Sequence, residues 1–311
     1  MLAIFFKTLP FFGLIGLGYG AARIRFFSEE ASAHLTKFVF YFALSAMLFR
    51  FSANLSFDEI FEPRLATAYL WGTGVTYAIG MLIAFARGLD TQTAAIEAQC
   101  AAIGNTGFLG VPMLALLLGQ EAVGPIILIL SIDLIVFSSA LTLIVTAARE
   151  GSMSLRIVQK LAVGLLKNPM IVSIAAGLMV SATGLGLHDV LDSFLSTLGA
   201  AATPGALFAI GASLASKSAE RLQIAAWLSF AKLILHPLFV GMGVYLFFPV
   251  DAYRASVAVS AAALPVAGNV FILAQHYGIA PQRVSASILI STAASILTVS
   301  AIIALVATTP L

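Results

Sequence analysis

The sequence contains little charge. Only 10% of its 311 residues are Asp, Glu, Lys or Arg, whereas a soluble domain contains about 25%. Hydrophobic residues make up 60% of the chain, and the mean hydropathy is +1.04. This composition excludes an ordinary soluble domain and is typical of an integral membrane protein, whose surroundings are the lipid bilayer. The net charge of +2 is small and dispersed over the chain, which gives no reason to expect a nucleic-acid partner.

Cysteine and the motifs of common enzymes are also scarce. Cys100 is the only cysteine, which excludes an intrachain disulfide and a cysteine-rich metal site. The histidines, His34, His188, His236 and His276, are too dispersed to predict a metal centre. The sequence has no HExxH, GxSxG or Walker motif. We therefore predict that the chain is not an enzyme and that it holds no metal or cofactor.

Long apolar runs recur from one end of the sequence to the other. A bilayer span needs about 20 apolar residues, and splitting the chain at charged or Gly/Pro/Asn clusters predicts ten helices in an all-α membrane fold. The predicted ranges are 2–22, 35–53, 64–86, 92–118, 122–148, 168–186, 193–215, 222–248, 253–277 and 283–307. The first run could be a cleaved signal peptide, but its length and the many runs that follow favour a helix of the mature protein.

The basic residues are unevenly divided between the two sides of these spans. Eleven fall on one side: Arg23, Arg25, Lys37, Arg87, Arg149, Arg156, Lys160, Lys167, Lys217, Arg221 and Arg283. Four fall on the other: Lys7, Arg50, Arg64 and Arg254. Cytoplasmic loops carry the excess of Lys and Arg. The first side is therefore predicted to be cytoplasmic, with both termini on the opposite side.

The chain resembles itself at an offset of 159 residues. The matches include Pro10 with Pro169, Gly18 with Gly177, Phe49 with Phe208, Ala53 with Ala212, and Gly119 with Gly278. Their confinement to one offset predicts two five-helix repeats, at residues 1–148 and 168–311, joined by a basic cytoplasmic linker at 149–167. Because five is odd, the second repeat is inverted relative to the first. Inverted repeats are typical of secondary transporters.

Two of the predicted spans contain residues that interrupt a helix. The stretch "AAIGNTGFLGVP" lies at 101–112, and its counterpart in the second repeat is "AAALPVAGNVFILAQ" at 261–275. At about 1.5 Å per residue, Asn105 and Pro265 each lie roughly 20 Å from the start of their spans, near the middle of the bilayer. We therefore expect two broken helices, one from each repeat, to meet there.

Such breaks have chemical consequences. Backbone N–H groups at a restarted helix suit an anion, whereas carbonyls and Asn side chains could equally serve a cation or a hydroxyl. Alternatively, Asn105 and Asn269 only cap the broken ends. The symmetric position of the two breaks favours a binding site. Asn105 is the first candidate to contact the ligand, and the backbone N–H groups of Thr106 and Gly107 are the second.

Asp133 and Lys232 are the ionisable residues predicted to lie deepest in the membrane, each about 15 Å from its surface. Their equal depth suggests a pair, which could be a structural ion pair between two helices or a proton-coupling site. His236 lies one turn beyond Lys232 and is either a proton relay or a hydrogen-bond donor in the core. Glu97 lies near the cytoplasmic end of its span and is not a site candidate.

Four motifs together resemble the auxin efflux carrier family, which includes plant auxin exporters and bacterial permeases for malonate and malate. They are "GNTGFLGVP" at 104–112, "TPGALFAIGASLA" at 203–215, "KLILHPL" at 232–238 and "ALPVAGNVFILA" at 263–274. The resemblance extends over essentially the whole chain. It implies the ten-helix inverted fold of bile-acid symporters and sodium/proton antiporters, in a bacterial inner membrane.

In such folds, spans 1, 2, 6 and 7 form a scaffold that dimerises, and spans 3–5 and 8–10 form a moving transport domain. The crossing of spans 4 and 9 is the substrate site, so Asn105 would contact a substrate carboxylate. Asp133 and Lys232 are similar to an acidic and basic pair in some sodium/proton antiporters. The predicted substrate-site residues are Asn105, Thr106, Gly107, Pro112, Pro265, Gly268 and Asn269.

The sequence also departs from its relatives. Many of them have Leu-Pro-Ala in span 2, where this chain has Leu44, Ser45 and Ala46, and the long cytoplasmic loop of plant carriers is absent. Bile-acid symporters hold sodium partly through an acidic residue near the span-9 break, and no acidic residue follows Arg254 in this chain. Sodium coupling is therefore disfavoured.

The leading hypothesis is a homodimeric carrier of small organic anions, such as dicarboxylates or auxin-like carboxylates. The alternatives are a sodium-coupled symporter for a carboxylate or sterol-like molecule, and a membrane receptor that binds a ligand in the same pocket without transporting it.

Overall fold

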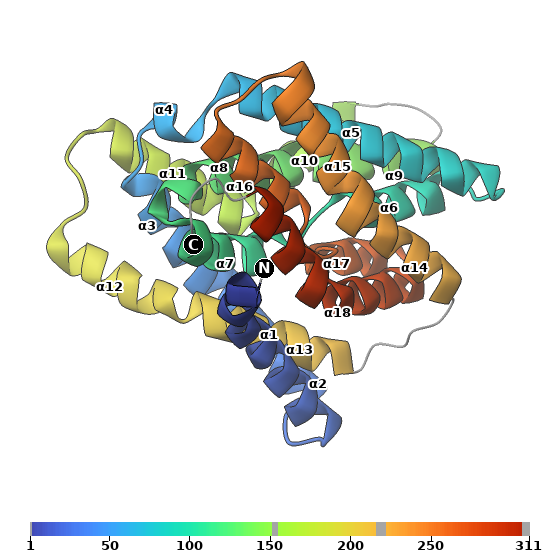
Figure 1. The fold of residues 1–311 in the computed structure, drawn as a ribbon, viewed down its shortest axis with the longest axis horizontal. Helices are drawn as coiled ribbons and strands as arrows, with labels where there is room; N and C mark the ends of the chain where they lie inside the picture. Colours follow the sequence, from blue (N-terminus) through green and yellow to red (C-terminus); the bar gives the residue numbers. More distant parts are fainter. Residues whose placement is uncertain (1, 151–154, 216–221, 307–311) are drawn as a thin grey trace.

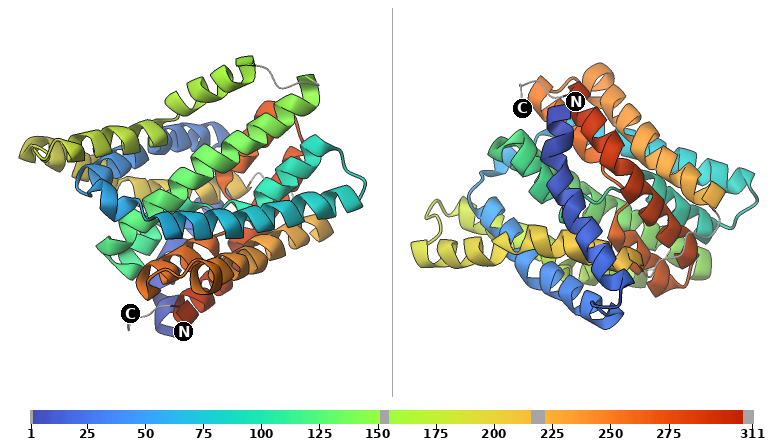
Figure 2. Two further views of the ribbon diagram at one scale, coloured as in Figure 1. Left: turned by 90° about the horizontal axis from the view of Figure 1, so that it is seen from above. Right: turned by 60° about the horizontal axis from the view of Figure 1, so that its bottom comes forward.

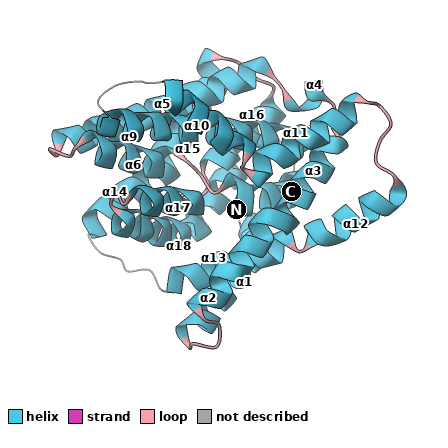
Figure 3. Cartoon of the chain, turned by 180° about the vertical axis from the view of Figure 1, so that it is seen from behind, coloured by secondary structure: helices cyan, strands magenta, loops and turns pink. Residues whose placement is uncertain are grey.

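The computed structural model of the chain describes residues 2–150, 155–215 and 222–306, and nearly all of these are helical (Figures 1 and 3). Extended pairing within the described residues is limited to one antiparallel bridge, between Gly104 and Val266. The basic residues Lys217 and Arg221 lie outside the described ranges. The fold is therefore an all-α membrane fold, in agreement with the prediction from composition.

Seven helices in the described ranges are long and apolar enough to cross a membrane. They are Phe5–Arg23, Glu29–Ala53, Pro63–Ala86, Gln120–Arg149, Asp189–Ala215, Leu222–Phe247 and Pro281–Val306. Each overlaps one of the ten predicted ranges. The elements within them are α1 (Leu2–Arg23), α2 (Glu29–Phe38), η1 (Val39–Ala43), α3 (Leu44–Ala53), α5 (Pro63–Ala86), η3 (Gln120–Ala122), α8 (Val123–Ile132), η4 (Asp133–Phe137), α9 (Ser138–Glu150), α12 (Asp189–Ala200), α13 (Ala202–Ala215), α14 (Leu222–Phe230), η5 (Ala231–Leu235), α15 (His236–Met242), η6 (Gly243–Phe247) and α18 (Pro281–Val306).

The other three predicted ranges contain shorter helices. Range 168–186 holds α11 (Pro169–Ala182), and range 92–118 holds α6 (Thr91–Ala102), η2 (Thr106–Gly110) and α7 (Val111–Leu118). Range 253–277 holds α16 (Ala252–Ala262) and α17 (Gly268–Tyr277). A short α4 (Phe57–Ile60) lies between the second and third long helices. The helical conformation is thus interrupted in both stretches that contain the Gly/Pro/Asn clusters.

Two boundaries differ from the prediction. The second span begins at Glu29 rather than at 35, because Ser28 caps the helix and Glu29 and Glu30 occupy its first turn. Lys37, which falls at the start of the predicted range 35–53, therefore lies in the last turn of α2. The predicted linker at 149–167 also contains α10 (Leu155–Leu166), and residues 151–154 of that linker lie outside the described ranges.

Glycines allow two pairs of helices to cross at very short range. A Cβ atom added to Gly18 on α1 would lie 2.1 Å from the carbonyl oxygen of Phe208 on α13, where the two helices cross in Figure 2 (right). A Cβ atom added to Gly177 on α11 would lie 2.5 Å from the carbonyl oxygen of Phe49 on α3. Close approach through small residues is how membrane helices gain packing energy without a hydrophobic driving force. The helices α1, α3, α11 and α13 are therefore joined by backbone contacts.

The start of α1 also contacts the end of α18. The hydroxyl groups of Thr8 and Ser300 are hydrogen-bonded at 2.8 Å, with both side chains buried. The two ends lie next to each other in both views of Figure 2. Because α1 packs on α13 and α18, it is an integral part of the described fold.

Replacing Gly18 by alanine tests the backbone contact. The added methyl group would overlap a carbonyl that cannot move aside, and overpacking of this kind costs about 1–3 kcal/mol. We expect Gly18→Ala to lower the melting temperature of the detergent-purified protein. Gly16→Ala on the same helix is the matched control, because nothing lies within 4 Å of its added Cβ. Equal melting temperatures for the two variants would contradict the proposed contact.

Candidate functional site

The first interruption separates α6 from η2. Helix α6 ends at Ala102, and Ile103 is extended, with φ −95° and ψ 119°. Helical structure restarts at Thr106, where the backbone N–H groups of Leu109 and Gly110 donate to the carbonyl of Asn105. Gly104 allows a close approach here, because an added Cβ would lie 3.2 Å from the ammonium of Lys232. The sequence "IGN" is therefore the point at which the helix opens.

The second interruption lies against the first. Helix α16 ends at Ala262 and α17 begins at Gly268. The N–H of Asn105 donates to the carbonyl of Pro265 at 2.8 Å, and the N–H of Ala267 donates to the carbonyl of Ile103 at 3.1 Å. Apolar surroundings make unpaired backbone groups costly. Each interrupted segment thus provides hydrogen-bond partners for backbone groups of the other. These backbone hydrogen bonds hold the two segments in contact.

The two restarted helices keep free donors at their first turns. Neither η2 nor α17 receives a side-chain cap at its start. The N–H groups of Thr106, Gly107, Gly268 and Asn269 make no hydrogen bond to another element within the described ranges. Unpaired N–H groups give a helix start a partial positive charge, which suits a carboxylate or another anion.

The side-chain amide of Asn105 makes no hydrogen bond within the described residues. Only 6% of the residue is exposed, and its side chain makes no cap at the start of η2. The Oδ1 atom of Asn269 is also buried without a hydrogen-bond partner. The interpretation of these asparagines as helix caps is therefore wrong, because neither amide oxygen accepts a bond from a helix start. Buried amides that lack a partner are expected where a ligand or water completes them.

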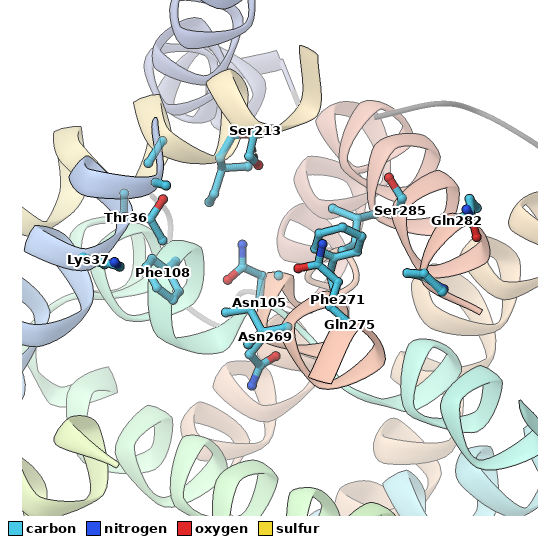
Figure 4. Close-up of a pocket in the computed structure, with 18 residues that line it drawn as sticks. Thr36, Lys37, Asn105, Phe108, Ser213, Asn269, Phe271, Gln275, Gln282 and Ser285 are labelled. Atoms are coloured by element: carbon cyan, nitrogen blue, oxygen red, sulfur yellow. Dashed lines mark hydrogen bonds between the residues drawn. The ribbon is translucent and has the colours of Figure 1, made fainter. Parts of the chain in front are cut away.

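A cavity of about 710 Å³ reaches the crossing of the two breaks. In Figure 4, Asn105 and Asn269 lie between Thr36 and Lys37 on one side and Gln275 and Ser285 on the other. The lining residues are Ala33, Thr36, Lys37, Asn105, Phe108, Ala206, Ala209, Ile210, Ser213, Gly268, Asn269, Phe271, Ile272, Gln275, Pro281, Gln282, Ser285 and Ile288. The cavity therefore lies between α2 and α13 on one side and the breaks, α17 and α18 on the other.

A second, smaller cavity of about 60 Å³ borders the same crossing. It shares Asn105, Phe108 and Asn269 with the large cavity and extends to Asp133 and Asn168. Its volume and polar lining are sufficient for ordered water. The breaks are thus bordered by space on two sides, and one of these spaces contains an acidic side chain.

The predicted substrate-site residues divide into two groups. Asn105, Gly107, Gly268 and Asn269 line one or both cavities. Thr106, Pro112 and Pro265 line neither, and all three are buried. Their positions support the breaks: Pro112 lies in the first turn of α7, the carbonyl of Pro265 pairs with Asn105, and the Thr106 hydroxyl points to Asp133.

Asp133 and Lys232 do not form a direct ion pair. Asp133 accepts hydrogen bonds from the Tyr69 hydroxyl at 2.9 Å and from the Thr106 hydroxyl at 3.4 Å. The ammonium of Lys232 donates to the carbonyl of Ala262, the last residue of α16. The charges therefore lie at opposite kinds of helix end, the acid beside the start of η2 and the base at the end of α16. Each charge has the sign that its helix end favours.

His236 extends the polar cluster away from the break. Its Nδ1 atom lies 2.9 Å from the Lys232 ammonium, and its Nε2 atom lies 3.0 Å from the Thr73 hydroxyl. Nδ1 also lies 3.2 Å from the carbonyl of Ala262, so it is placed between a donor, the ammonium, and an acceptor, the carbonyl, and the ring proton can sit on either nitrogen. The side chain of His236 thus links α15 to α5, as expected for a hydrogen-bonded core histidine.

Two features escaped the sequence-based prediction. Lys37 lines the large cavity, but the sequence-based prediction used it only to assign the cytoplasmic side. Glu97 is only 1% exposed and lies 2.7 Å from both Arg87 and Arg283. This carboxylate joins α6 to the end of α5 and the start of α18. Arg87 is ten residues from Glu97 but Arg283 is 186 residues away, so only their common cytoplasmic assignment could have brought all three together.

Comparisons with known proteins agree with this description. The chain matches the family described as "Membrane transport protein" over residues 3–303. It is also 32% identical over 310 residues to a protein of Rhizobium meliloti (strain 1021) named "Putative malonate transporter", a comparison that covers 96% of this chain and 94% of the relative. The relative is a transporter by name, and no enzyme is indicated. The chain therefore belongs to the auxin efflux carrier family of membrane transport proteins.

Proposed function

We propose that this transporter carries small organic anions such as dicarboxylates or auxin-like carboxylates. The observation that carries the proposal is the pair of uncapped helix starts, with free N–H groups beside the unpaired amide of Asn105, at a cavity of about 710 Å³. Such donors bind carboxylate oxygens without a full positive charge. The name of the relative, which mentions malonate, supports an anionic substrate.

We further propose that the chain forms ten membrane helices in two inverted repeats. The glycine contacts support this arrangement, because the same residues recur at the offset of 159. Gly18 packs on the backbone of Phe208 and Ala212, whereas Gly177 packs on that of Phe49 and Ala53. At this offset Gly18 corresponds to Gly177, Phe49 to Phe208 and Ala53 to Ala212, so each residue of the first contact has its counterpart in the second. Two equivalent contacts between equivalent residues are what a two-fold relation between repeats produces.

The ends of the interrupted helices support the same relation. Gly119 follows α7 with φ 96°, and Gly278 follows α17 with φ 68°. Glycine is favoured where a helix ends with a positive φ. The preceding carbonyls also share a feature, because Leu118 accepts from the Tyr253 hydroxyl and Tyr277 accepts from Arg149.

The proposed mechanism is alternating access, in which a transport domain shifts against a scaffold. The scaffold comprises α1, α2, α3, α11, α12 and α13, and the glycine contacts hold several of these helices together. The ion pairs of the buried Glu97 carboxylate hold α5, α6 and α18 of the transport domain together. The large cavity lies between the two groups, so a relative shift would change its access. The proposal includes a homodimer in a bacterial inner membrane, with both termini on the non-cytoplasmic side.

Replacing Asn105 tests the proposed substrate site. A hydrogen bond to a charged group contributes about 1.5–3 kcal/mol, so Asn105→Ala should weaken carboxylate binding on the order of 10- to 100-fold. Binding of malonate to the purified protein, measured by calorimetry, gives the affinity. Asn54→Ala is the control, because Asn54 is exposed and lines neither cavity. Unchanged affinity in Asn105→Ala would contradict the site.

Proton coupling through the Asp133, Lys232 and His236 cluster is a second proposal. It is favoured by the position of Asp133, which lines the small cavity beside Asn105 and Asn269. Its carboxylate accepts two side-chain hydrogen bonds, and a carboxylate can accept about four. Its two oxygens therefore keep capacity for a proton or for further hydrogen bonds.

We expect Asp133→Asn to uncouple transport from protons. The amide cannot take up or release the proton that a carboxylate can, so an imposed pH gradient should no longer drive substrate accumulation in proteoliposomes. Asp189→Asn, at an exposed position at the start of α12, is the control. A wild-type response of Asp133→Asn to the pH gradient would exclude coupling through this residue and leave it a structural role at the start of η2.

A further inference from the structure

Lys37 differs from every other residue that lines the large cavity. It is the only charged side chain among the lining residues of the described chain, and no acidic residue accompanies it. Within the described ranges it forms no ion pair. It is exposed and lies in the last turn of α2. A lysine with no carboxylate nearby gives the cavity a positive potential, which attracts anions.

The position of Lys37 separates it from the donors at the crossing. Asn105 and the N–H groups of Gly268 and Asn269 belong to the interrupted helices, whereas Lys37 and its neighbour Thr36 belong to α2 on the opposite wall. Figure 4 shows these groups around one space, with Phe108 next to Lys37. The cavity therefore offers two places for negative charge, one neutral and built from hydrogen-bond donors, the other a full cation.

The two places differ in what they can recognise. Directed N–H and amide donors suit a single carboxylate, which accepts hydrogen bonds at both oxygens. An ammonium on a flexible stem acts as a point charge and responds to a second anionic group at the other end of the substrate. A monocarboxylate would use only the donors at the crossing. A dicarboxylate would use both, and would contact both walls of the cavity.

We propose that Lys37 determines specificity by binding the second anionic group of a dianionic substrate, and so distinguishes dicarboxylates from monocarboxylates. This inference rests on the proposed function, because it requires that the first carboxylate binds at the crossing. It assigns the choice between the two substrate types to one side chain on α2. Removal of this charge then converts a selective site into one that accepts either type equally well.

The test compares two ligands that share one carbon skeleton but carry either one or two negative charges. Malonate and its monomethyl ester are the probes, and their affinities for the wild-type protein and for Lys37→Gln and Lys37→Arg are measured by calorimetry above the second ionisation of malonate. We expect Lys37→Gln to weaken malonate binding at least 10-fold and to change binding of the monoester less than 2-fold. Lys37→Arg should restore most of the preference, since it restores the charge.

Lys167→Gln is the matched control. Lys167 is an exposed basic residue assigned to the same side of the membrane and lines neither cavity, so its loss changes the net charge equally. A preference for malonate that is lost in Lys37→Gln and kept in Lys167→Gln supports the inference. Equal weakening of both probes by Lys37→Gln, or no weakening of either, overturns it. The melting temperature without ligand shows whether Lys37→Gln is folded.

The outcome for Asn105→Ala distinguishes a failure of the proposed role of Lys37 from a failure of the proposed function. If Asn105→Ala weakens binding of both probes while Lys37→Gln changes neither, the carboxylate site at the crossing stands and the role of Lys37 is wrong. If malonate binds unchanged to both variants, the proposed function fails as well.

Discussion

The structure depends on one constraint, namely that lipid cannot hydrogen-bond to the backbone. A helix that opens in the middle of a membrane must find partners for its freed groups within the protein. In this chain the two open segments pair with each other, through Asn105 with Pro265 and Ala267 with Ile103. That pairing satisfies the groups that lie between the segments. It leaves free the N–H groups that begin the next helices, at a crossing that two cavities border.

The same constraint explains the placement of the buried charges. A helix that ends in the membrane leaves carbonyls at its end and N–H groups at its restart, with partial charges of opposite sign. Lys232 donates to the last carbonyl of α16, and Asp133 lies beside the first residue of η2. A direct ion pair would have satisfied the two charges but not the helix ends. Holding them apart lets each charge stabilise a separate break, and it keeps Asp133 beside the small cavity.

Sequence alone predicted the features that depend on local chemistry. The Gly/Pro/Asn clusters predicted the interruptions near Asn105 and Pro265, because these residues disfavour a continuous helix, and composition predicted a helical membrane protein. Sequence alone did not predict which side chains on different helices contact each other. Equal depth suggested that Asp133 and Lys232 pair, but depth does not say which neighbour a side chain faces. Lys37 served only to assign the cytoplasmic side, because charge does not say which cavity a side chain lines, and Ser28 caps the helix two turns before its predicted start.

The walls of the large cavity differ in how they are held. Where α1 crosses α13 and α3 crosses α11, backbones touch through glycine, so these crossings leave no freedom to slide. The wall on the other side is held together by the hydrogen bonds between the two interrupted segments and by the ion pairs of Glu97. Between these two groups lies about 710 Å³ of space. Packed interiors respond to force as rigid bodies, so relative motion is concentrated where contact is least. Under the proposed mechanism that place is the cavity, and a substrate bound there would touch both walls.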